Sequence, residues 1–309
     1  MKRQKSSENS ASSIPRFLPQ KERTIHRPAP IHLLAFAVSF AMVGVCTGLA
    51  LEGGADPLAA VTLRTLGTVA LFALYFRLGG VAFGLPGRDR ALALAIGVPL
   101  SVNNYLVIAA MAEIPVPLVV LIFYLWPAIT SAASWLLGKD RFGWRSLAGL
   151  TLAFAGIGLA LNVDLTAAQA KGVWLALGAA FTFSAVFLLT SHFFHGRDTR
   201  SATLHMTLVG AAVFVTAWLA SGGAALPVTA SGWTGALGMP FFYAFSMIGL
   251  FAATVRLGPM RTGFYMNFEP IAAVVLSAVI LEQRLAPVQL AGAALVVTAL
   301  FLFRPPPRD

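Results

Sequence analysis

The segment FYMNFEPIAAVV, residues 264–275, places a carboxylate directly before a proline within an otherwise apolar stretch. An ionised group near the centre of a bilayer costs roughly 2.5–3.5 kcal/mol on insertion scales, and a proline removes one helical hydrogen bond. Glu269 therefore marks a candidate site. Three roles are open for its carboxylate: a counter-charge for an ammonium group, a group that exchanges a proton, or the structural partner of a basic residue such as Arg64.

Tyr265 and Arg64 also lie in apolar stretches and are candidates for the same site. Tyr265 precedes Glu269 by four residues, so in a helix the hydroxyl and the carboxylate lie on one face. Asn267 projects about 200° away from Glu269 and is expected to point elsewhere. Arg64 is predicted either to hold a carboxylate group or to bond the carbonyl oxygens of an interrupted helix.

Four prolines lie within apolar segments and are predicted to interrupt helices: Pro99, Pro127, Pro240 and Pro270. A proline leaves the carbonyl oxygen four residues before it without its helical partner. For the last proline this carbonyl belongs to Met266, and for the second to Phe123. We expect both oxygens to be free unless water or a hydroxyl group satisfies them.

Aromatic and amide side chains flank these prolines. Tyr124, Trp126 and Tyr243 are predicted to form an aromatic wall for an amphipathic solute, with ordinary packing as the alternative. Asn103 and Asn104 are adjacent, and their side chains diverge by about 100° on a helix. We expect one amide to line the site and the other to bond a neighbouring helix.

The sequence lacks the residue groups and motifs that metal sites, nucleotide cofactors and hydrolases require. Cys46 is the single cysteine, and His192 and His195 have no carboxylate or thiol at a suitable spacing, so no metal site is expected. The motifs G-x-G-x-x-G, G-x-x-x-x-G-K-[ST], H-E-x-x-H and G-x-S-x-G are absent, so we expect no nucleotide cofactor and none of the common hydrolase mechanisms. The net charge of +10 is spread along the chain, which argues against nucleic-acid binding.

The composition is that of a polytopic membrane protein. Of the 309 residues, 58% are hydrophobic and only 11% are charged, against about 25% in a soluble domain. About 20 apolar residues are needed for one helical span. Ten segments qualify, and they predict an all-α integral membrane fold: 31–51, 57–77, 90–112, 116–138, 145–162, 172–192, 202–221, 232–255, 261–281 and 286–304.

The distribution of basic residues predicts the orientation of these spans. Residues 1–30 are polar, basic and without an apolar core, which is typical of a disordered cytoplasmic tail rather than a signal peptide. Among the 22 Lys and Arg residues, all but Lys171, Arg284 and Arg64 lie in that tail, in alternate loops or at the C-terminus. Because cytoplasmic segments carry the excess of positive charge, we expect both termini in the cytoplasm of a protein of the inner membrane.

The chain also contains an internal repeat. An offset of 141 residues pairs TLR at 62–64 with TLH at 203–205, and an offset of 143 pairs Pro127 with Pro270 and LAG at 147–149 with LAG at 290–292. These matches divide the chain into repeats at 31–162 and 172–304. Since each repeat contains five spans, an odd number, the second is expected to be inverted in the membrane.

The segments IPVPLVVLIFYLWPAITSAASWLLGKDRFGWRSLAGLTLAFAGIGLAL and LGPMRTGFYMNFEPIAAVVLSAVILEQRLAPVQLAGAALVVTALFLF each resemble the second half of an EamA-type repeat. Residues 31–304 as a whole are similar to the ten-helix drug/metabolite transporter superfamily. That family commonly has a Gly-Glu pair in the loop of each segment, where this chain has Gly138-Lys139 and Leu281-Glu282. The resemblance implies export or exchange of small metabolites, often amino acids or amphipathic amines.

These observations predict a secondary transporter whose two halves alternate access to a site in the middle of the membrane. Its partners would be a small solute, with coupling to protons open, and the lipid bilayer; a homodimer is also left open. Two alternatives come from other classes. One is a membrane-embedded enzyme that modifies lipids, and the other is a membrane scaffold or sensor that transports nothing.

Overall fold

The computed structural model describes residues 30–80, 83–136, 144–161, 167–194, 199–257 and 265–302. In this part of the chain all regular elements are helices, and each of the ten predicted segments contains at least one. They are α1 (Pro30–Glu52), α2 (Pro57–Gly79), α3 (Gly87–Met111), α4 (Val116–Phe123), α5 (Trp126–Leu136), α6 (Trp144–Leu161), α7 (Ala167–Phe193), α8 (Arg200–Ala220), α9 (Ala230–Leu257), α11 (Glu269–Ile280) and α12 (Pro287–Leu302).

Six spans in the described residues are long and apolar enough to cross a membrane, and α4 with α5 together make one of them. Shorter apolar stretches lie in α6, α11 and α12. The all-helical membrane fold predicted from composition is confirmed.

Local sequence sets where α2 begins and ends. The Asp56 side chain accepts a hydrogen bond of 2.7 Å from the backbone N–H of Ala59, and Pro57 occupies the first turn, where its missing N–H costs nothing. The helix ends at Gly80, whose φ of 61° is left-handed and whose N–H bonds the carbonyl oxygen of Phe76. The same Asp56 also accepts from Ala225 N–H, so the cap ties α2 to the segment between α8 and α9.

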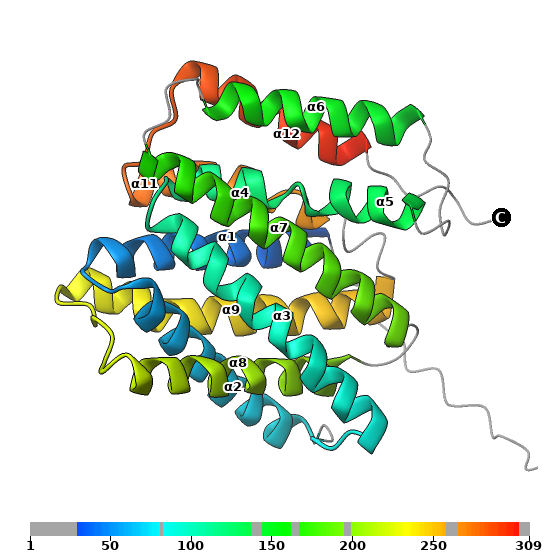
Figure 1. The fold of residues 1–309 in the computed structure, drawn as a ribbon, viewed down its shortest axis with the longest axis vertical. Helices are drawn as coiled ribbons and strands as arrows, with labels where there is room; N and C mark the ends of the chain where they lie inside the picture. The colour runs from blue at the N-terminus through cyan, green and yellow to red at the C-terminus, as the bar shows by residue number, and fades with distance from the viewer. Residues whose placement is uncertain are drawn as a thin grey trace, which may run out of the picture.

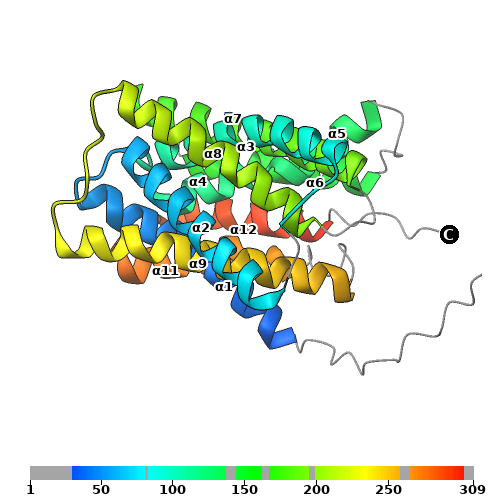
Figure 2. The same ribbon diagram turned by 90° about the horizontal axis from the view of Figure 1, so that it is seen from below.

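The helices of the two halves pack mainly on each other. The two halves make equivalent contacts: exchanging the halves turns the pair α1–α9 into α3–α7, and the pair α2–α9 into α3–α8. The remaining pairs join a helix to its equivalent in the other half: α2–α8, α6–α12 and α4–α11. In Figure 1, α6 and α12 lie together at the top, α2 and α8 at the bottom, and the other helices between them. Figure 2 shows the same bundle from below, with α8, α3 and α7 on one side and α1, α9 and α11 on the other. The fold is therefore a two-repeat architecture.

Glycine residues allow the closest of these helix pairs to form. A Cβ atom on Gly156 of α6 would lie 2.7 Å from the carbonyl oxygen of Gly292 on α12, nearer than real Cβ contacts come. On α9, Gly235 lies against the backbone of α1 at Cys46 in the same way. Small residues are used because apolar side chains gain little by leaving lipid, so close packing supplies the attraction between helices.

The four prolines have two different effects. Pro127 and Pro270 are the second residues of α5 and α11, and each follows a two-residue turn that interrupts its span. In contrast, Pro99 lies inside the continuous helix α3 and Pro240 inside the continuous helix α9. The prediction that these two prolines break their helices is wrong. A reason is visible on α2, where Gly67 packs so closely that an added Cβ would lie 2.6 Å from Pro240, so a neighbouring helix supports α9 across its proline.

We expect Gly156→Ala to lower the free energy of unfolding by about 1–3 kcal/mol, because the new methyl group must separate α6 from α12. Gly158, one half-turn along α6, is the matched control because no atom lies within 4 Å of its added Cβ. Gly158→Ala should leave stability unchanged or slightly higher. Thermal unfolding of both variants in one detergent measures the difference, and equal melting temperatures would refute this account of the α6–α12 contact.

Candidate functional site

The two interrupted spans have the same local geometry. Helix α4 ends at Phe123, a turn follows at 124–125, and α5 starts at Trp126. In the second half the turn is at 267–268, and α11 starts at Glu269. Helices α4 and α11 pack on each other, which brings backbone freed by the breaks to the contact between the halves.

Tyr124 joins the two breaks. Its hydroxyl oxygen lies 2.7 Å from Glu269 Oε2 and 3.0 Å from the carbonyl oxygen of Met266, and its side chain is buried. The Met266 oxygen is the one that Pro270 deprives of its helical partner, so a hydroxyl from the opposite half satisfies it. Sequence spacing had suggested Tyr265 as the neighbour of Glu269, but the turn at 267–268 separates these two residues and ends the helical register between them.

A single phenolic proton can serve both acceptors only as a shared, three-centre hydrogen bond, which is weaker toward each acceptor than a bond of its own. When Glu269 carries a proton, its O–H donates to Tyr124 and Tyr124 donates to Met266, so both short contacts are hydrogen bonds. When Glu269 is ionised, the charge-assisted bond from Tyr124 to the carboxylate competes with the bond to Met266. The two distances therefore fit a protonated Glu269 with one hydrogen bond to each partner.

Arg64 lies apart from this group. It is 6% exposed, its Cζ atom stands 5.2 Å from the ring centroid of Tyr243 on α9, and its Nη2 atom has no hydrogen-bond partner. No ion pair joins Arg64 to Glu269, whose carboxylate contacts Tyr124 instead. The alternative in which these two residues form a direct structural pair is wrong for this structure.

Each group has an aromatic neighbour that packs near the middle of α1. Phe40 of α1 makes an edge contact with Tyr243, with ring centroids 6.1 Å apart. The next residue, Ala41, belongs to the buried cluster that contains Tyr124. Phe40 and Ala41 are in the middle of α1, roughly 15 Å from its start at 1.5 Å per residue. The rings of Tyr243 and Tyr124 thus both lie near the middle of α1.

An aromatic cluster lines the first break. The Trp126 ring stands 5.1 Å from Phe183 and 5.0 Å from Phe187 of α7, and Phe123 stands 5.3 Å from Phe183. The Trp126 carbonyl oxygen accepts a hydrogen bond of 2.9 Å from the Ser184 hydroxyl of α7. Sequence analysis did not identify Phe183 and Phe187, although their spacing of four residues places both rings on one face of α7.

The amide side chains divide as the helical geometry requires. Asn103 is buried and donates to the Ala179 carbonyl oxygen of α7 at 2.8 Å, so it serves packing. Asn104 is partly exposed. Asn267 donates to the Leu300 carbonyl oxygen of α12 at 3.3 Å and thus points away from Glu269. Of the two adjacent amides, only Asn103 is buried.

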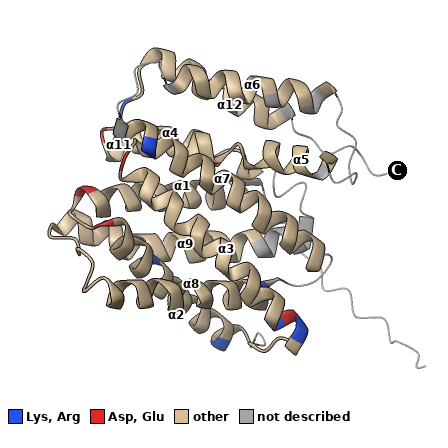
Figure 3. Cartoon of the chain, in the orientation of Figure 1, with Lys and Arg blue, Asp and Glu red and all other residues tan. Residues whose placement is uncertain are grey.

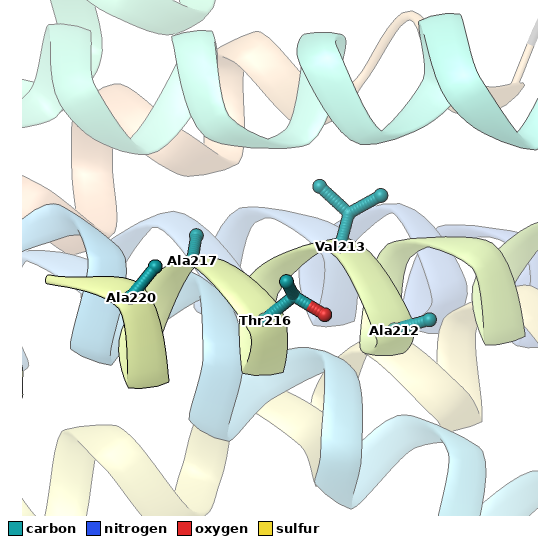
Figure 4. Close-up of a pocket in the computed structure, with 5 residues that line it drawn as sticks. All are labelled: Ala212, Val213, Thr216, Ala217 and Ala220. Carbon is teal, nitrogen blue, oxygen red and sulfur yellow. The ribbon is translucent and has the colours of Figure 1, made fainter.

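Other features of the described residues offer no competing site. They contain no group of three or more His, Cys, Asp or Glu side chains that could hold a metal ion, and His195 lies outside them. His205 contacts the Ser201 carbonyl oxygen of its own helix at 2.8 Å. A groove of about 450 Å³ on α8 is lined by uncharged side chains, as Figure 4 shows: Ala212, Val213, Thr216, Ala217 and Ala220. It has no group that would bind a charged solute.

Polar contacts tie the halves together at one end of the bundle. Gln283, after α11, donates to Glu52 at the end of α1 and accepts from the Val116 N–H at the start of α4, both at 3.0 Å. At the same end, Lys171 of α7 and Glu113 form an ion pair of 2.5 Å. These contacts join the two repeats on the side where α1, α3 and α11 finish.

Comparison with known proteins gives a matching protein family and a structure of similar fold. The EamA-like transporter family matches residues 28–162 and 170–304, one match for each half. A solved structure titled "Crystal structure of protein" is similar with a TM-score of 0.65 and 16% sequence identity, over 89% of this chain and 97% of that chain. At this identity the likeness shows the fold alone. The search of curated proteins gave no match.

Tyr124→Phe removes the hydroxyl that serves both breaks. We expect the free energy of unfolding to fall by about 1–3 kcal/mol, because the Met266 oxygen and the Glu269 carboxyl group lose a buried partner. Tyr105→Phe is the control, since Tyr105 is 40% exposed on α3. Unfolding of both variants in detergent provides the measurement. A Tyr124→Phe protein as stable as Tyr105→Phe would contradict the proposed hydrogen bonding.

Proposed function

The chain belongs to the EamA-like transporter family, whose members are membrane transporters of small solutes rather than enzymes, and we propose that it exports or exchanges an amine-bearing metabolite such as an amino acid. In this proposal Glu269 binds either a proton or the ammonium group of the solute. The two repeats move around this site and open it alternately to the two sides of the membrane.

The observation that carries the proposal is the placement of Glu269 at the start of α11, in contact with Tyr124 of the opposite half. A lone carboxylate in the membrane interior is costly, so it needs a proton or a cation in every step of the cycle. The contacts of Tyr124 with Glu269 and Met266 provide for the protonated state. An arriving ammonium group displaces the proton, and this competition exchanges the solute for a proton.

The aromatic cluster and the polar contacts at the bundle end support the remaining steps. Trp126 with Phe183 offers a ring surface for the apolar part of the solute. We also assign Asn104, Tyr265 and Tyr243 to the proposed solute site. The contacts of Gln283 with Glu52 and Val116 join the halves at one end, so they must separate when that end opens. Interrupted helices adapt to such movement because their turns already lack regular hydrogen bonds.

We further propose that the protein lies in the cytoplasmic membrane with both termini inside. Figure 3 shows acidic residues gathered at the end of the bundle where α1 finishes and α2 begins. Arg77, Arg88 and Arg90 lie near the opposite end, at the finish of α2 and the start of α3. The positive-inside rule places that basic end in the cytoplasm.

Glu269→Gln tests the proton exchange. Glutamine can still bond Tyr124, so we expect a folded protein, but its side chain neither ionises nor releases a proton. In proteoliposomes that contain an amino acid and face a proton gradient, the variant should lose at least tenfold in gradient-driven flux. Wild-type affinity for the solute should fall as the pH decreases, because protons compete for the carboxylate, whereas any binding left in the variant should not depend on pH.

Glu282→Gln is the matched control for this experiment. Glu282 follows the same helix, is exposed and carries the same charge. Its replacement should leave both flux and pH dependence unchanged. Full gradient-driven flux in the Glu269→Gln protein would eliminate the proposed role of the carboxylate.

The orientation is tested with reporter fusions. A fluorescent protein fused after residue 309 should fluoresce and alkaline phosphatase at that position should be inactive, because we expect that terminus in the cytoplasm. Alkaline phosphatase inserted after Gly223, between α8 and α9, should be active outside. The reverse pattern would overturn the orientation without affecting the fold.

A further inference from the structure

The segment that follows α11 fastens three helices at the end of the bundle where α1 finishes. Gln283 donates to the Glu52 carboxylate of α1 and accepts from the Val116 N–H, both at 3.0 Å. Val116 is the first residue of α4, so its N–H has no partner within the helix. The Gln283 backbone N–H in turn bonds the Ser277 carbonyl oxygen of α11 at 3.2 Å. One residue therefore bonds α1, α4 and α11.

Leu281 adds an apolar contact at the same place. Its side chain is buried and belongs to the cluster that also contains Val116 and Tyr124. A Cβ atom on Gly48 of α1 would lie 2.6 Å from Leu281 Cδ1 and 3.3 Å from Val116 Cγ2, so both side chains pack directly on this glycine. Leu281 and Gln283, with the turn that joins them, thus form one unit, here called the latch.

The latch lies at one end of the contact between α4 and α11, and Glu269 lies at the other. The two helices pack on each other (Figure 1). Gln283 meets the start of α4, whereas Glu269 at the start of α11 contacts Tyr124, directly after the end of α4. The helices therefore run antiparallel, and α4 separates the two contacts by roughly 12 Å at 1.5 Å per residue. In the orientation proposed above, the latch is on the outer side of Glu269.

The turn inside the latch is strained. Glu282 has a φ of 57°, and among the described residues it is the only non-glycine residue with a positive φ. This left-handed conformation favours glycine, because a Cβ atom comes too close to a neighbouring carbonyl oxygen. The Glu282 side chain is exposed, so its own packing does not offset the strain. The contacts of Leu281 and Gln283 hold the turn in place, while its strain favours release.

The other polar contact at this end has a different setting. Lys171 of α7 pairs with Glu113, which follows α3, and these two helices pack closely there. A Cβ atom on Gly172 would lie 2.8 Å from Ile114 Cγ2. The ion pair therefore belongs to one closely packed helix pair, whereas the latch lies where α1, α4 and α11 meet.

We propose that the latch keeps the outer side of the Glu269 site closed, and that release of its strained turn opens this side. The inference rests on the proposed function and its orientation, and it adds the element that controls access from outside. Because the contacts of the latch and the strain of its turn oppose each other, single substitutions shift the balance in either direction.

The rate at which a thiol reagent reaches the contact between α4 and α11 tests this proposal. The reporter is Val120→Cys in a Cys46→Ala protein, because Val120 is buried on α4 between the latch and Tyr124. A membrane-impermeant methanethiosulfonate is added outside right-side-out membrane vesicles. The labelling rate then follows the fraction of molecules that are open to the outside.

Two substitutions in the latch should change this rate in opposite directions. Gln283→Ala should speed labelling about fivefold, because the closed state loses two hydrogen bonds. Glu282→Gly should slow labelling about fivefold, because the closed turn is no longer strained. If Gln283→Ala does not fold, Glu282→Gly still decides, since relief of strain does not destabilise the protein.

Each substitution has a matched control. Glu282→Gln keeps the Cβ atom and therefore the strain, and Lys171→Gln removes the other polar contact at the same end. Both should label at the wild-type rate. Equal rates in wild type and both latch variants, faster labelling of Glu282→Gly, or a rise in Lys171→Gln as large as that in Gln283→Ala would overturn the proposal.

The labelling separates the latch from the proposed role of Glu269. If Glu269→Gln keeps full gradient-driven flux while the latch variants change labelling as expected, the role of Glu269 fails and the latch stands. If Glu269→Gln loses flux but the latch variants label like wild type, the latch fails and the role of Glu269 stands. Faster labelling of Gln283→Ala only in inside-out vesicles would overturn the assignment of the latch to the outer side.

Discussion

A polar group inside a membrane has to find its partner within the protein, and the link between Tyr124 and the start of α11 follows from this constraint. Pro270 leaves the Met266 carbonyl oxygen without a helical partner, and Glu269 adds a carboxyl group beside it. One hydroxyl from the opposite half contacts both. The contact between α4 and α11 thus stabilises the interrupted helix, and at the same time it sets the surroundings of the residue on which we base the transport mechanism.

The repeat supplies the scaffold, and the differences between the halves supply the chemistry. Both interrupted spans resume their helix one residue before a proline, but the first does so with Trp126 and the second with Glu269. Tyr124 bonds across to the other half, whereas Asn267, at the equivalent position, bonds α12 of its own half. One break is therefore aromatic and the other ionisable.

Arg64 and Glu269, which carry opposite charges, do not pair with each other in the bundle. A direct pair between Arg64 and Glu269 would satisfy both residues without a solute and would leave nothing to bind. Instead, Glu269 contacts Tyr124, and Arg64 lies over Tyr243.

The sequence by itself determined the membrane class, the ten helical segments, the two repeats and the breaks at Pro127 and Pro270. Each of these depends on properties that are local or repeated along the chain, such as the length of an apolar run or a proline that recurs at a fixed offset. Spacing also showed that Asn103 and Asn104 must diverge. Only the tertiary structure decided which amide packs, that α3 and α9 continue through Pro99 and Pro240, and that Glu269 contacts Tyr124 and forms no ion pair with Arg64. These outcomes depend on which helix lies alongside, and helical periodicity gives the direction of a side chain without identifying its neighbour.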